Sequence, residues 1–442
     1  MIENNHLFLF KTAVGLLSLA AFILSYRYLV LRNVSERTFK WWATSIWMMS
    51  RVGLFLAIFV VAGYAAHSDV LAYYYPQAKA AIRGELVYRD FSSSYGPGFP
   101  YLASLSVIIW DSPKSIIMMS ILIDGLAAFC WRRLSTSLLD KEGSRIVLLL
   151  YLCNPVVILT VAVSGQNQVW VAALWALAGL CAIRGRDFTC GFLLVASAGL
   201  VKILGLLVVP SFLLTAENKL RSTAGLIAGC TVFFLPFLMS GTDVLRSLRA
   251  EALDISSGNL PFLATLLGIN VREPGLAGFF NAFLIVSLMA AVFAGWWLHR
   301  HCDAQSLRFS SICLVLLTLM LISKKSYTNY LVLFAFPLGG CVVIAGADLK
   351  RSLTFLIFSA LAALEPSLWF RWLGTSTFGE VLAKFPHANQ LPISFWLFLL
   401  VEVLLIGGYC WLLTSCLLAA ASCEMKSETR MRPAHALGTQ DL

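Results

Sequence analysis

Apolar stretches long enough to cross a lipid bilayer recur from one end of this chain to the other. A membrane-spanning helix needs about 20 predominantly apolar residues. The runs that approach or exceed this length cover residues 7–31, 45–66, 115–132, 145–163, 167–183, 222–240, 276–298, 307–323, 327–347, 352–370 and 392–420. Runs of this length and number predict an all-α, polytopic membrane protein.

Composition supports the same fold class. The chain has 442 residues, of which 59% are hydrophobic and only 13% are charged, whereas a typical soluble domain carries about 25% charged residues. No polar stretch approaches the roughly 50 residues that a soluble domain needs. We therefore expect residues 1–442 to form one integral membrane domain, with a core at about 45–340, C-terminal helices at 341–422 and a cytoplasmic tail at 423–442.

Charge and cysteine patterns argue against other classes of protein. The net charge of +10 comes from Lys and Arg gathered at helix ends, where they anchor helices and meet anionic headgroups. A nucleic-acid partner is not expected, because no basic stripe interleaved with aromatics is present. The 11 cysteines show no CxxC spacing and lie almost wholly in apolar runs, so neither a disulfide framework nor a metal site is predicted.

Basic residues assign the sides of the membrane. The first, third and fifth loops between the apolar runs are rich in Lys and Arg, so they belong in the cytoplasm by the positive-inside rule. The second loop, which holds Asp69, then lies outside. The short run 98–110 is expected to lie in the interface. The run 188–214 is interpreted as two short helices, Phe188–Leu200 and Lys202–Leu214, because a single crossing would invert every later basic loop. About 11–13 membrane segments result, and the segments left outside are 67–97, 164–168, 241–275, 323–326 and 371–391.

The first outside loop, at 67–100, carries the candidate catalytic carboxylate. Asp69 stands at the mouth of a membrane helix, where partial desolvation raises the pKa of a carboxyl group towards that of a useful base. A simple helix cap explains Asp69 alone equally well. The first membrane helix is expected to be retained, because residues 1–11 lack the basic region of a cleaved signal peptide.

Three further polar clusters interrupt apolar sequence. Ser164–Gln168 is an amide-rich turn suited to sugar hydroxyls, although any turn would satisfy the topology. Lys202 lies inside an apolar run, where a lysine is costly unless it snorkels or is paired, and by default marks a site. The pair Lys324–Lys325 falls outside against the positive-inside bias. It suggests a phosphate partner, and a solvated turn is the alternative.

These motifs, taken in order, resemble the GT-C superfamily of membrane glycosyltransferases. The run S-D-V…V-Y-R-D-F…Y-G-P-G-F-P-Y, then Asn154-Pro155, the amide turn, Lys202 and Pro210 are similar to two families. One is the bacterial polyprenol-phosphate-mannose-dependent mannosyltransferases, and the other is the first mannosyltransferase of glycosylphosphatidylinositol synthesis. Ser256–Gly268 and Tyr327–Pro337 are weaker matches to their later loops, so the resemblance spans about residues 65–340.

The resemblance implies a function. A hexose, with mannose favoured, would pass with inversion from a polyprenyl-phosphate sugar to a lipid-linked or glycan acceptor on the outer face of the bacterial cytoplasmic membrane. Asp69 would be the general base. Cationic residues would bind the donor phosphate, namely Lys202, Lys324, Lys325 and Arg249. Polar residues would bind sugar or acceptor, namely Asp90, Tyr95, Gln166, Asn167, Asn259, Asn329 and Tyr330.

The chain also departs from these families at two positions. Leu71 stands where the glycosylphosphatidylinositol enzymes carry a second acidic residue, which argues against a metal site built from such a pair. No cofactor is predicted, and a divalent metal is the alternative. Asn329 precedes Tyr330 where the family has a histidine. A transporter or flippase of lipid-linked saccharides is the alternative function. It is disfavoured because the two halves of the chain show no matching pair of broken helices.

Overall fold

The computed structural model describes residues 2–30, 32–244, 255–299, 304–368 and 393–431. Within these ranges the chain is helical and contains no strand, apart from an isolated bridge between Val87 and Phe91. The predicted all-α fold class is therefore confirmed. Arg249, the predicted outside segment 371–391 and the end of the predicted tail lie outside the described residues.

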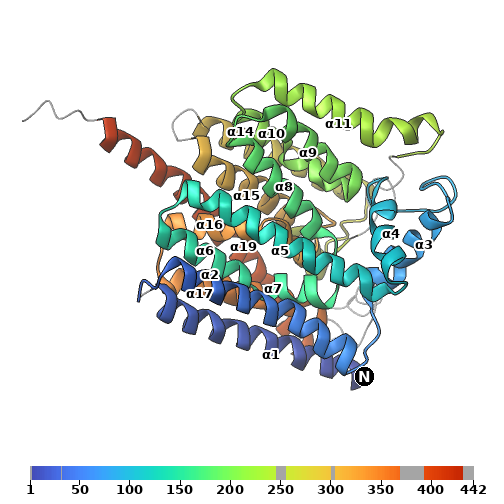
Figure 1. Cartoon of the computed structure of the whole chain (residues 1–442), viewed down its shortest axis with the longest axis horizontal. Helices are drawn as coiled ribbons and strands as arrows, with labels where there is room; N and C mark the ends of the chain where they lie inside the picture. Colours follow the sequence, from blue (N-terminus) through green and yellow to red (C-terminus); the bar gives the residue numbers. More distant parts are fainter. Residues whose placement is uncertain (1, 31, 245–254, 300–303, 369–392, 432–442) are drawn as a thin grey trace, which may run out of the picture.

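The first half of the chain forms the elements that surround Asp69. They are α1 (Ile2–Ser25) with η1 (Tyr26–Val30), α2 (Glu36–Trp47) with η2 (Met48–Gly53) and η3 (Leu56–Val61), η4 (Val70–Tyr74), α3 (Tyr75–Ile82), α4 (Phe99–Ile109), α5 (Pro113–Leu138), α6 (Lys141–Leu152), α7 (Pro155–Ile158) with η5 (Leu159–Val163), α8 (Gln168–Ala182) and α9 (Asp187–Leu200). The short helices α3 and α4 lie at one end of the bundle, on the side where the N-terminus also lies (Figure 1).

The second half of the chain completes the bundle. Its elements are η6 (Ile203–Val208), α10 (Val209–Leu214), α11 (Lys219–Met239), α13 (Leu260–Leu266), α14 (Pro274–His299), α15 (Ala304–Ile322), η7 (Thr328–Leu333), α16 (Ala335–Ala345), α17 (Leu349–Leu368) and α19 (Ile393–Met431). The helix α19 extends beyond residue 422, so the first part of the segment predicted as a tail continues a helix. The helix α17 packs against α1, which brings together elements from opposite ends of the sequence.

Helix length separates two kinds of membrane segment. Within the described residues, seven helices are long and apolar enough to span a bilayer, and an eighth span forms if Lys141–Leu152 and Pro155–Val163, bent by 47°, count as one. The other expected segments correspond to shorter apolar helices of 10–17 residues, namely Gln168–Ala182, Asp187–Leu200, Ile203–Leu214, Phe309–Ile322 and Ala335–Ala345. The run 98–110 forms the short helix α4, and the run 188–214 breaks at Lys202 as predicted.

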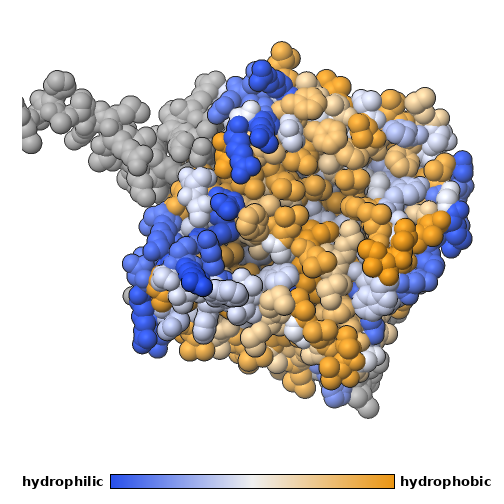
Figure 2. Space-filling view, viewed as in Figure 1, coloured by the Kyte–Doolittle hydropathy of each residue, from blue (hydrophilic) through white to orange (hydrophobic). Residues whose placement is uncertain are grey.

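The surface matches a bilayer environment. Figure 2 shows apolar side chains across the middle of the visible face, with hydrophilic residues gathered towards opposite edges. Large apolar side chains on α11 and α14, among them Leu220, Ile227 and Met289, are more than half exposed. Exposed apolar surface of this extent would be unfavourable in water and is favourable against lipid chains.

A fully buried ion pair ties three helices together. The guanidinium of Arg51, on η2, lies 3.2 Å from a carboxylate oxygen of Asp124 on α5, and neither side chain is exposed. Asp124 also accepts hydrogen bonds from the Trp47 indole and the Tyr151 hydroxyl, and Arg51 donates to the Leu152 carbonyl on α6. Burial of either charge without a partner would be costly, so the pair fixes how these helices meet.

We predict that Asp124→Leu destabilises the protein by about 3–5 kcal/mol, because Arg51 would be left as a buried charge without its partner. Thermal unfolding in detergent measures the effect. The double variant Arg51→Leu with Asp124→Leu should recover most of the lost stability. A double variant no more stable than Asp124→Leu alone would contradict a role for charge compensation.

Candidate active site

A cavity of about 730 Å³ gathers segments that are far apart in the sequence. It is lined by residues from four of the five segments predicted to lie outside, namely 67–97, 164–168, 241–275 and 323–326, and by the adjoining residues 327–330. The fifth segment, 371–391, lies outside the described residues. Asp69, Tyr95, Gln166, Lys202, Lys325, Asn329 and Tyr330 all contribute to its wall.

Asp69 is presented to this cavity by a strained turn. The preceding residue, Ser68, has φ +60°, a left-handed conformation that is uncommon for residues other than glycine. Asp69 occupies the N-cap position of η4, yet its side chain makes no capping hydrogen bond. Its carboxylate instead lies 3.5 Å from the Tyr95 hydroxyl, and the Gln166 side chain lowers its pKa. The simple helix-cap explanation of Asp69 is therefore insufficient.

The surroundings of Asp69 favour a carboxyl group with base character. Burial raises its pKa above the ordinary value of 3.8, because a charged carboxylate is poorly solvated there. The ammonium group of Lys202 and the hydrogen bonds from Gln166 and Tyr95 offset part of this rise, and Lys325 adds a smaller effect. A carboxyl group with a raised pKa is a stronger base than an exposed aspartate, which suits Asp69 to accept a proton.

The amide-rich turn packs directly against the segment that carries Asp69. Gly165 has φ +59°, and a side chain there would meet Val70 and Ile117. The Gln166 side chain donates to the Ser68 hydroxyl at 3.1 Å and accepts from the Tyr74 hydroxyl at 3.1 Å. The orientation of the Gln166 amide is thereby fixed beside the carboxylate.

The other two amides of this turn behave differently from each other. Asn167 was expected in the site, but it does not line the cavity, although its buried side-chain atoms have no hydrogen-bond partner within the described residues. Gln168 does line the cavity, and its buried carbonyl oxygen likewise has no partner among the described residues. Buried amides are normally paired, so Gln168 is the stronger candidate for contact with a polar ligand.

Tyr95 is positioned by close backbone contact between the first loop and the end of α9. The amides of Gly96 and Gly98 donate to the carbonyls of Val201 and Gly199, at 2.9 Å and 2.7 Å. A Cβ atom on Gly96 would lie 2.1 Å from the Ala198 carbonyl oxygen. Only glycine permits this approach, so the break after α9 holds the loop that carries Tyr95.

Lys202 lies at the same break, at the N-cap position of η6. Its ammonium donates to the Tyr330 hydroxyl at 2.8 Å, and it lies 4.8 Å from the centre of the Tyr330 ring and 5.9 Å from that of Tyr95. The interruption between α9 and η6 places Lys202 in the cavity wall, where contact with aromatic rings stabilises its charge. Its positive charge lowers the pKa of Asp69, because it favours the ionised carboxylate.

The two lysines of the pair 324–325 have different surroundings. Lys325 lines the cavity, whereas Lys324 does not. The backbone carbonyl of Lys324 accepts a hydrogen bond from the amide of Ser256 at 2.8 Å, and the hydroxyl of Ser256 donates to the carbonyl of Ser326. These contacts join the segment 255–259 to the turn that carries Lys324 and Lys325. Asn329 faces the cavity, and its buried side-chain oxygen lacks a partner among the described residues.

Two residues expected to bind sugar or acceptor serve local structure instead. Asp90 does not line the cavity. It pairs with Arg89 at 2.9 Å and accepts from the amide of Leu86, and these contacts lower its pKa to about 2. Asn259 is buried and caps α13 by accepting from the Phe262 amide at 2.9 Å. Both side chains satisfy turn and cap requirements, so their expected role is not supported by their position.

The cavity also holds charged residues that the sequence analysis did not select. Lys11 on α1 and Glu365 on α17 both line it, with His67. Glu365 interacts with Glu402 of α19, and the Glu402 carboxylate accepts a hydrogen bond from the Gly258 amide at 2.9 Å. The signal that could have found them is the rule already applied to Lys202, that an ionisable residue inside an apolar helix marks a site.

A separate cluster of cysteines lies away from this cavity. The sulfur atoms of Cys313, Cys341 and Cys416, on α15, α16 and α19, lie within 4.8 Å of one another and are buried. The sequence gives no spacing signal for them, because the helices that carry them meet only in the folded bundle. Within the described residues, these three cysteines form a group of potential metal ligands that lie close to one another. The expectation that Asp69 works without a metal remains a prediction.

The bundle and its polar cavity define a GT-C-type membrane glycosyltransferase, the class of protein that the order of the motifs resembles. The model of glycosyltransferase family 87 (GT87) matches residues 94–323, just over half of the chain, and the chain belongs to this family. The matched region includes Tyr95, Gln166 and Lys202 and begins after Asp69. A comparison with curated proteins finds no match.

We predict that Gly96→Ala lowers glycosyl transfer by about tenfold or more, because the added methyl group displaces the loop that holds Tyr95 and small misplacements are costly in active sites. Gly278→Ala is the matched control, since a Cβ atom there meets nothing within 4 Å. Initial rates are compared at equal amounts of folded protein. Equal rates for the two variants would show that the close contact at Gly96 is unimportant.

Proposed function

We propose that this protein transfers a hexose, with mannose favoured by the sequence resemblance, from a polyprenyl-phosphate sugar to a lipid-linked or glycan acceptor. Transfer takes place at the outer face of the cytoplasmic membrane, with inversion at the anomeric carbon. The observation that carries this proposal is the meeting of Asp69 and Lys202 in one cavity at the end of a membrane bundle. A lipid-linked donor explains why this chemistry is carried out by a chain embedded in the bilayer.

Asp69 acts as the general base. The acceptor hydroxyl gives its proton to the carboxylate as its oxygen attacks the anomeric carbon. A bond forms between that oxygen and the carbon, and the bond from the carbon to the phosphate oxygen breaks. The phosphate leaves with the electron pair. Attack and departure on opposite sides of the carbon invert its configuration.

The positive charges of the cavity stabilise the leaving group. A polyprenyl-phosphate sugar carries one negative charge on its phosphodiester, and the charge grows as the sugar bond breaks. Lys202 and Lys325 both line the cavity close enough to affect the ionisation of Asp69. Preorganised cations act most strongly where charge develops in the transition state. Lys324 does not line the cavity, and Arg249 lies outside the described residues, so its role in phosphate binding stays a prediction.

Neutral hydrogen-bonding groups complete the site. Gln166 and Tyr95 hold Asp69, and Tyr330 holds Lys202. Gln168 and Asn329 present buried carbonyl oxygens without partners within the described residues, so they suit donated hydrogen bonds from sugar hydroxyls. The site therefore separates into a base, a cationic region and a set of amides for the sugar.

We predict that Asp69→Asn lowers kcat by about 10²–10⁴, the usual contribution of a general base. Asp111→Asn is the control, because Asp111 is exposed and pairs with Lys79 away from the cavity. Release of polyprenyl phosphate upon addition of acceptor is the measurement, and it separates an enzyme from a flippase. Parental rates for an equally folded Asp69→Asn variant would remove Asp69 from the mechanism.

We predict a second effect on the pH dependence of kcat/KM. The base works only when ionised, so the rate falls as pH drops through the pKa of Asp69, which burial raises above 3.8. Lys202 lowers this pKa, so Lys202→Met should move the acidic limb to higher pH as well as lower the rate. Lys79→Met, outside the cavity, should leave the limb in place. If the acidic limb of Lys202→Met lies at the same pH as in the wild type, the charge of Lys202 does not affect the pKa of Asp69.

A further inference from the structure

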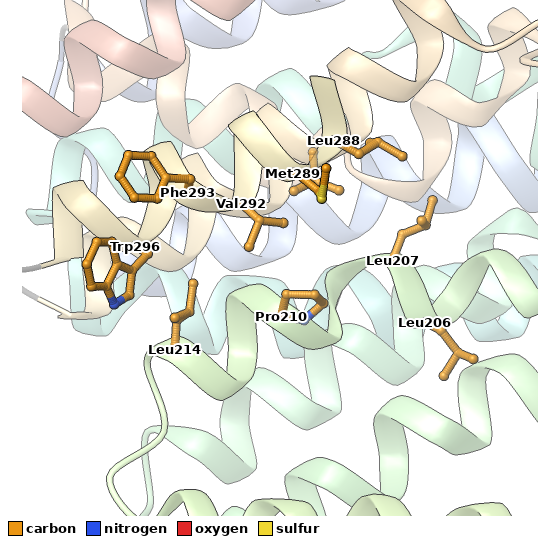
Figure 3. Close-up of a pocket in the computed structure, with 10 residues that line it drawn as sticks. Leu206, Leu207, Pro210, Leu214, Leu288, Met289, Val292, Phe293 and Trp296 are labelled. Carbon is orange, nitrogen blue, oxygen red and sulfur yellow. The ribbon is translucent and has the colours of Figure 1, made fainter. Parts of the chain in front are cut away.

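Two grooves of similar volume lie on the described part of the bundle, and their linings differ. The first, of about 680 Å³, lies between the η6–α10 segment and α14, and Figure 3 shows its apolar side chains facing each other. The second, of about 570 Å³, is formed by α2, α5 and α6. Lys40, Arg132 and Arg133 line it together with Glu36, so we call it the basic groove. It can select a ligand by charge, which an apolar lining cannot.

The basic groove has one charged end and one apolar end. At one end, the guanidinium of Arg132 on α5 lies 3.2 Å from the carboxylate of Glu36, the first residue of α2. At the other end, the indole of Trp47, the last residue of α2, donates to Asp124 at 2.9 Å. The residues that line the groove near Trp47 are small or apolar, namely Gly125, Ala128 and Leu152. A lining of this kind matches an amphipathic ligand.

The length of the basic groove corresponds to one leaflet of a bilayer. Glu36 and Trp47 both line it, and they are the first and last residues of α2, which is 12 residues long. At a rise of about 1.5 Å per residue, this helix is about 18 Å long. Half of the hydrocarbon core of a bilayer is about 15 Å thick. A lipid with its headgroup at the charged end would therefore keep its chains within a single leaflet.

The charged end of the groove carries two cations that the fold leaves available. Arg132 is held in its ion pair with Glu36. Lys40 on α2 and Arg133 on α5 are both exposed, and neither pairs with a carboxylate within the described residues. The Arg133 guanidinium lies 5.3 Å from the centre of the Phe129 ring, and this contact restricts its direction. Two positive charges on different helices can therefore reach one anionic group.

We propose that the basic groove binds one anionic glycerophospholipid, in the leaflet predicted to be cytoplasmic. Its phosphate lies between Lys40 and Arg133, and an acyl chain follows α2 and α5 towards Trp47. Basic pockets between membrane helices on the cytoplasmic side bind acidic headgroups. The positive charge of this lining favours phosphatidylglycerol over phosphatidylcholine, whose choline group is itself cationic. A free phosphate ion would use only the charged end and would leave the apolar length of the groove unused.

The basic groove is separate from the active site. No residue in the described part of the chain lines both cavities. Ile117, near the start of α5, lies beside Gly165 of the amide-rich turn, whereas Arg133 lies in the last turns of the same helix. The sixteen residues between Ile117 and Arg133 correspond to about 24 Å of helix. The proposal therefore goes beyond the proposed function and does not rest on it.

Lys40→Gln combined with Arg133→Gln tests the charged end, and Arg37→Gln combined with Arg184→Gln is the charge-matched control. Arg37 and Arg184 are exposed on the side predicted to be cytoplasmic and do not line the groove. The full-length protein, freed of lipid in neutral detergent, is titrated with phosphatidylglycerol or phosphatidylcholine, and bound lipid is counted by native mass spectrometry. We expect one phosphatidylglycerol per wild-type chain, bound about 30-fold more weakly by the groove variant, since each basic residue near a lipid headgroup contributes about fivefold. The control should bind as the wild type does.

Three results of this titration would overturn the proposal. Equal weakening in both double variants would indicate attraction by the whole basic surface. Equal affinity of the wild type for phosphatidylglycerol and phosphatidylcholine would indicate nonspecific bilayer lipid. Displacement of the bound lipid by an excess of inorganic phosphate would indicate a phosphate site in which the apolar length has no part. Thermal unfolding establishes that the compared variants are equally folded.

Thr44→Trp tests the apolar part by filling the groove from α2, and Ser45→Trp is its control on the same helix. Thr44 lines the groove and Ser45 does not, and both are exposed, so neither substitution disturbs buried packing. We expect Thr44→Trp to weaken phosphatidylglycerol binding about tenfold, because overfilling an apolar site is unfavourable by this much or more. Ser45→Trp should have no effect. Unchanged binding by Thr44→Trp would place the lipid outside the groove. Neither experiment measures sugar transfer, so failure of the proposed function would leave these results unaffected.

Discussion

The active site depends on a backbone contact between a broken helix and a loop. A helix that stops inside a membrane leaves carbonyl groups without partners, and lipid cannot satisfy them. Here the carbonyls of Gly199 and Val201 accept from the amides of Gly98 and Gly96. The same contact brings Tyr95 beside Asp69 and leaves Lys202 at the start of η6. The requirement to satisfy the backbone and the requirement to assemble the site are met by one pair of hydrogen bonds.

Charge is distributed in this bundle according to its use. Arg51 and Asp124 neutralise each other completely and lie away from the cavity. In the cavity, the two cations Lys202 and Lys325 accompany the single carboxylate of Asp69. Lys11 on α1 and Glu365 on α17 also line the wall. An ion pair buried inside the bundle stabilises the fold, whereas charged groups that line a cavity are placed to contact a ligand. The contrast separates structural from functional charges in a chain where both are rare.

The membrane helices can be predicted from the sequence because a bilayer requires a long run of apolar residues for each one. The division of 188–214 follows from the positions of later arginines and lysines, and the structure has the break at Lys202. Asp69, Gln166 and Lys202 stand out because polar residues interrupt apolar runs. The local contacts of Asp90 and Asn259 could not be foreseen, because only the folded backbone shows whether a polar side chain caps a turn or faces a cavity. Lys11 and Glu365 are missed because their meeting depends on the contact between α1 and α17.

The Arg51–Asp124 pair has a consequence for how the chain is made. Arg51 enters the membrane 73 residues before its carboxylate partner and 101 residues before the Leu152 carbonyl that it also binds. An arginine alone at the centre of a helix is unfavourable in lipid by about 2.5–3.5 kcal/mol. The second membrane helix therefore has reason to stay beside the insertion machinery until the fourth arrives. Early pairing of the amino-terminal helices would relieve this cost before the segments that complete the cavity are synthesised.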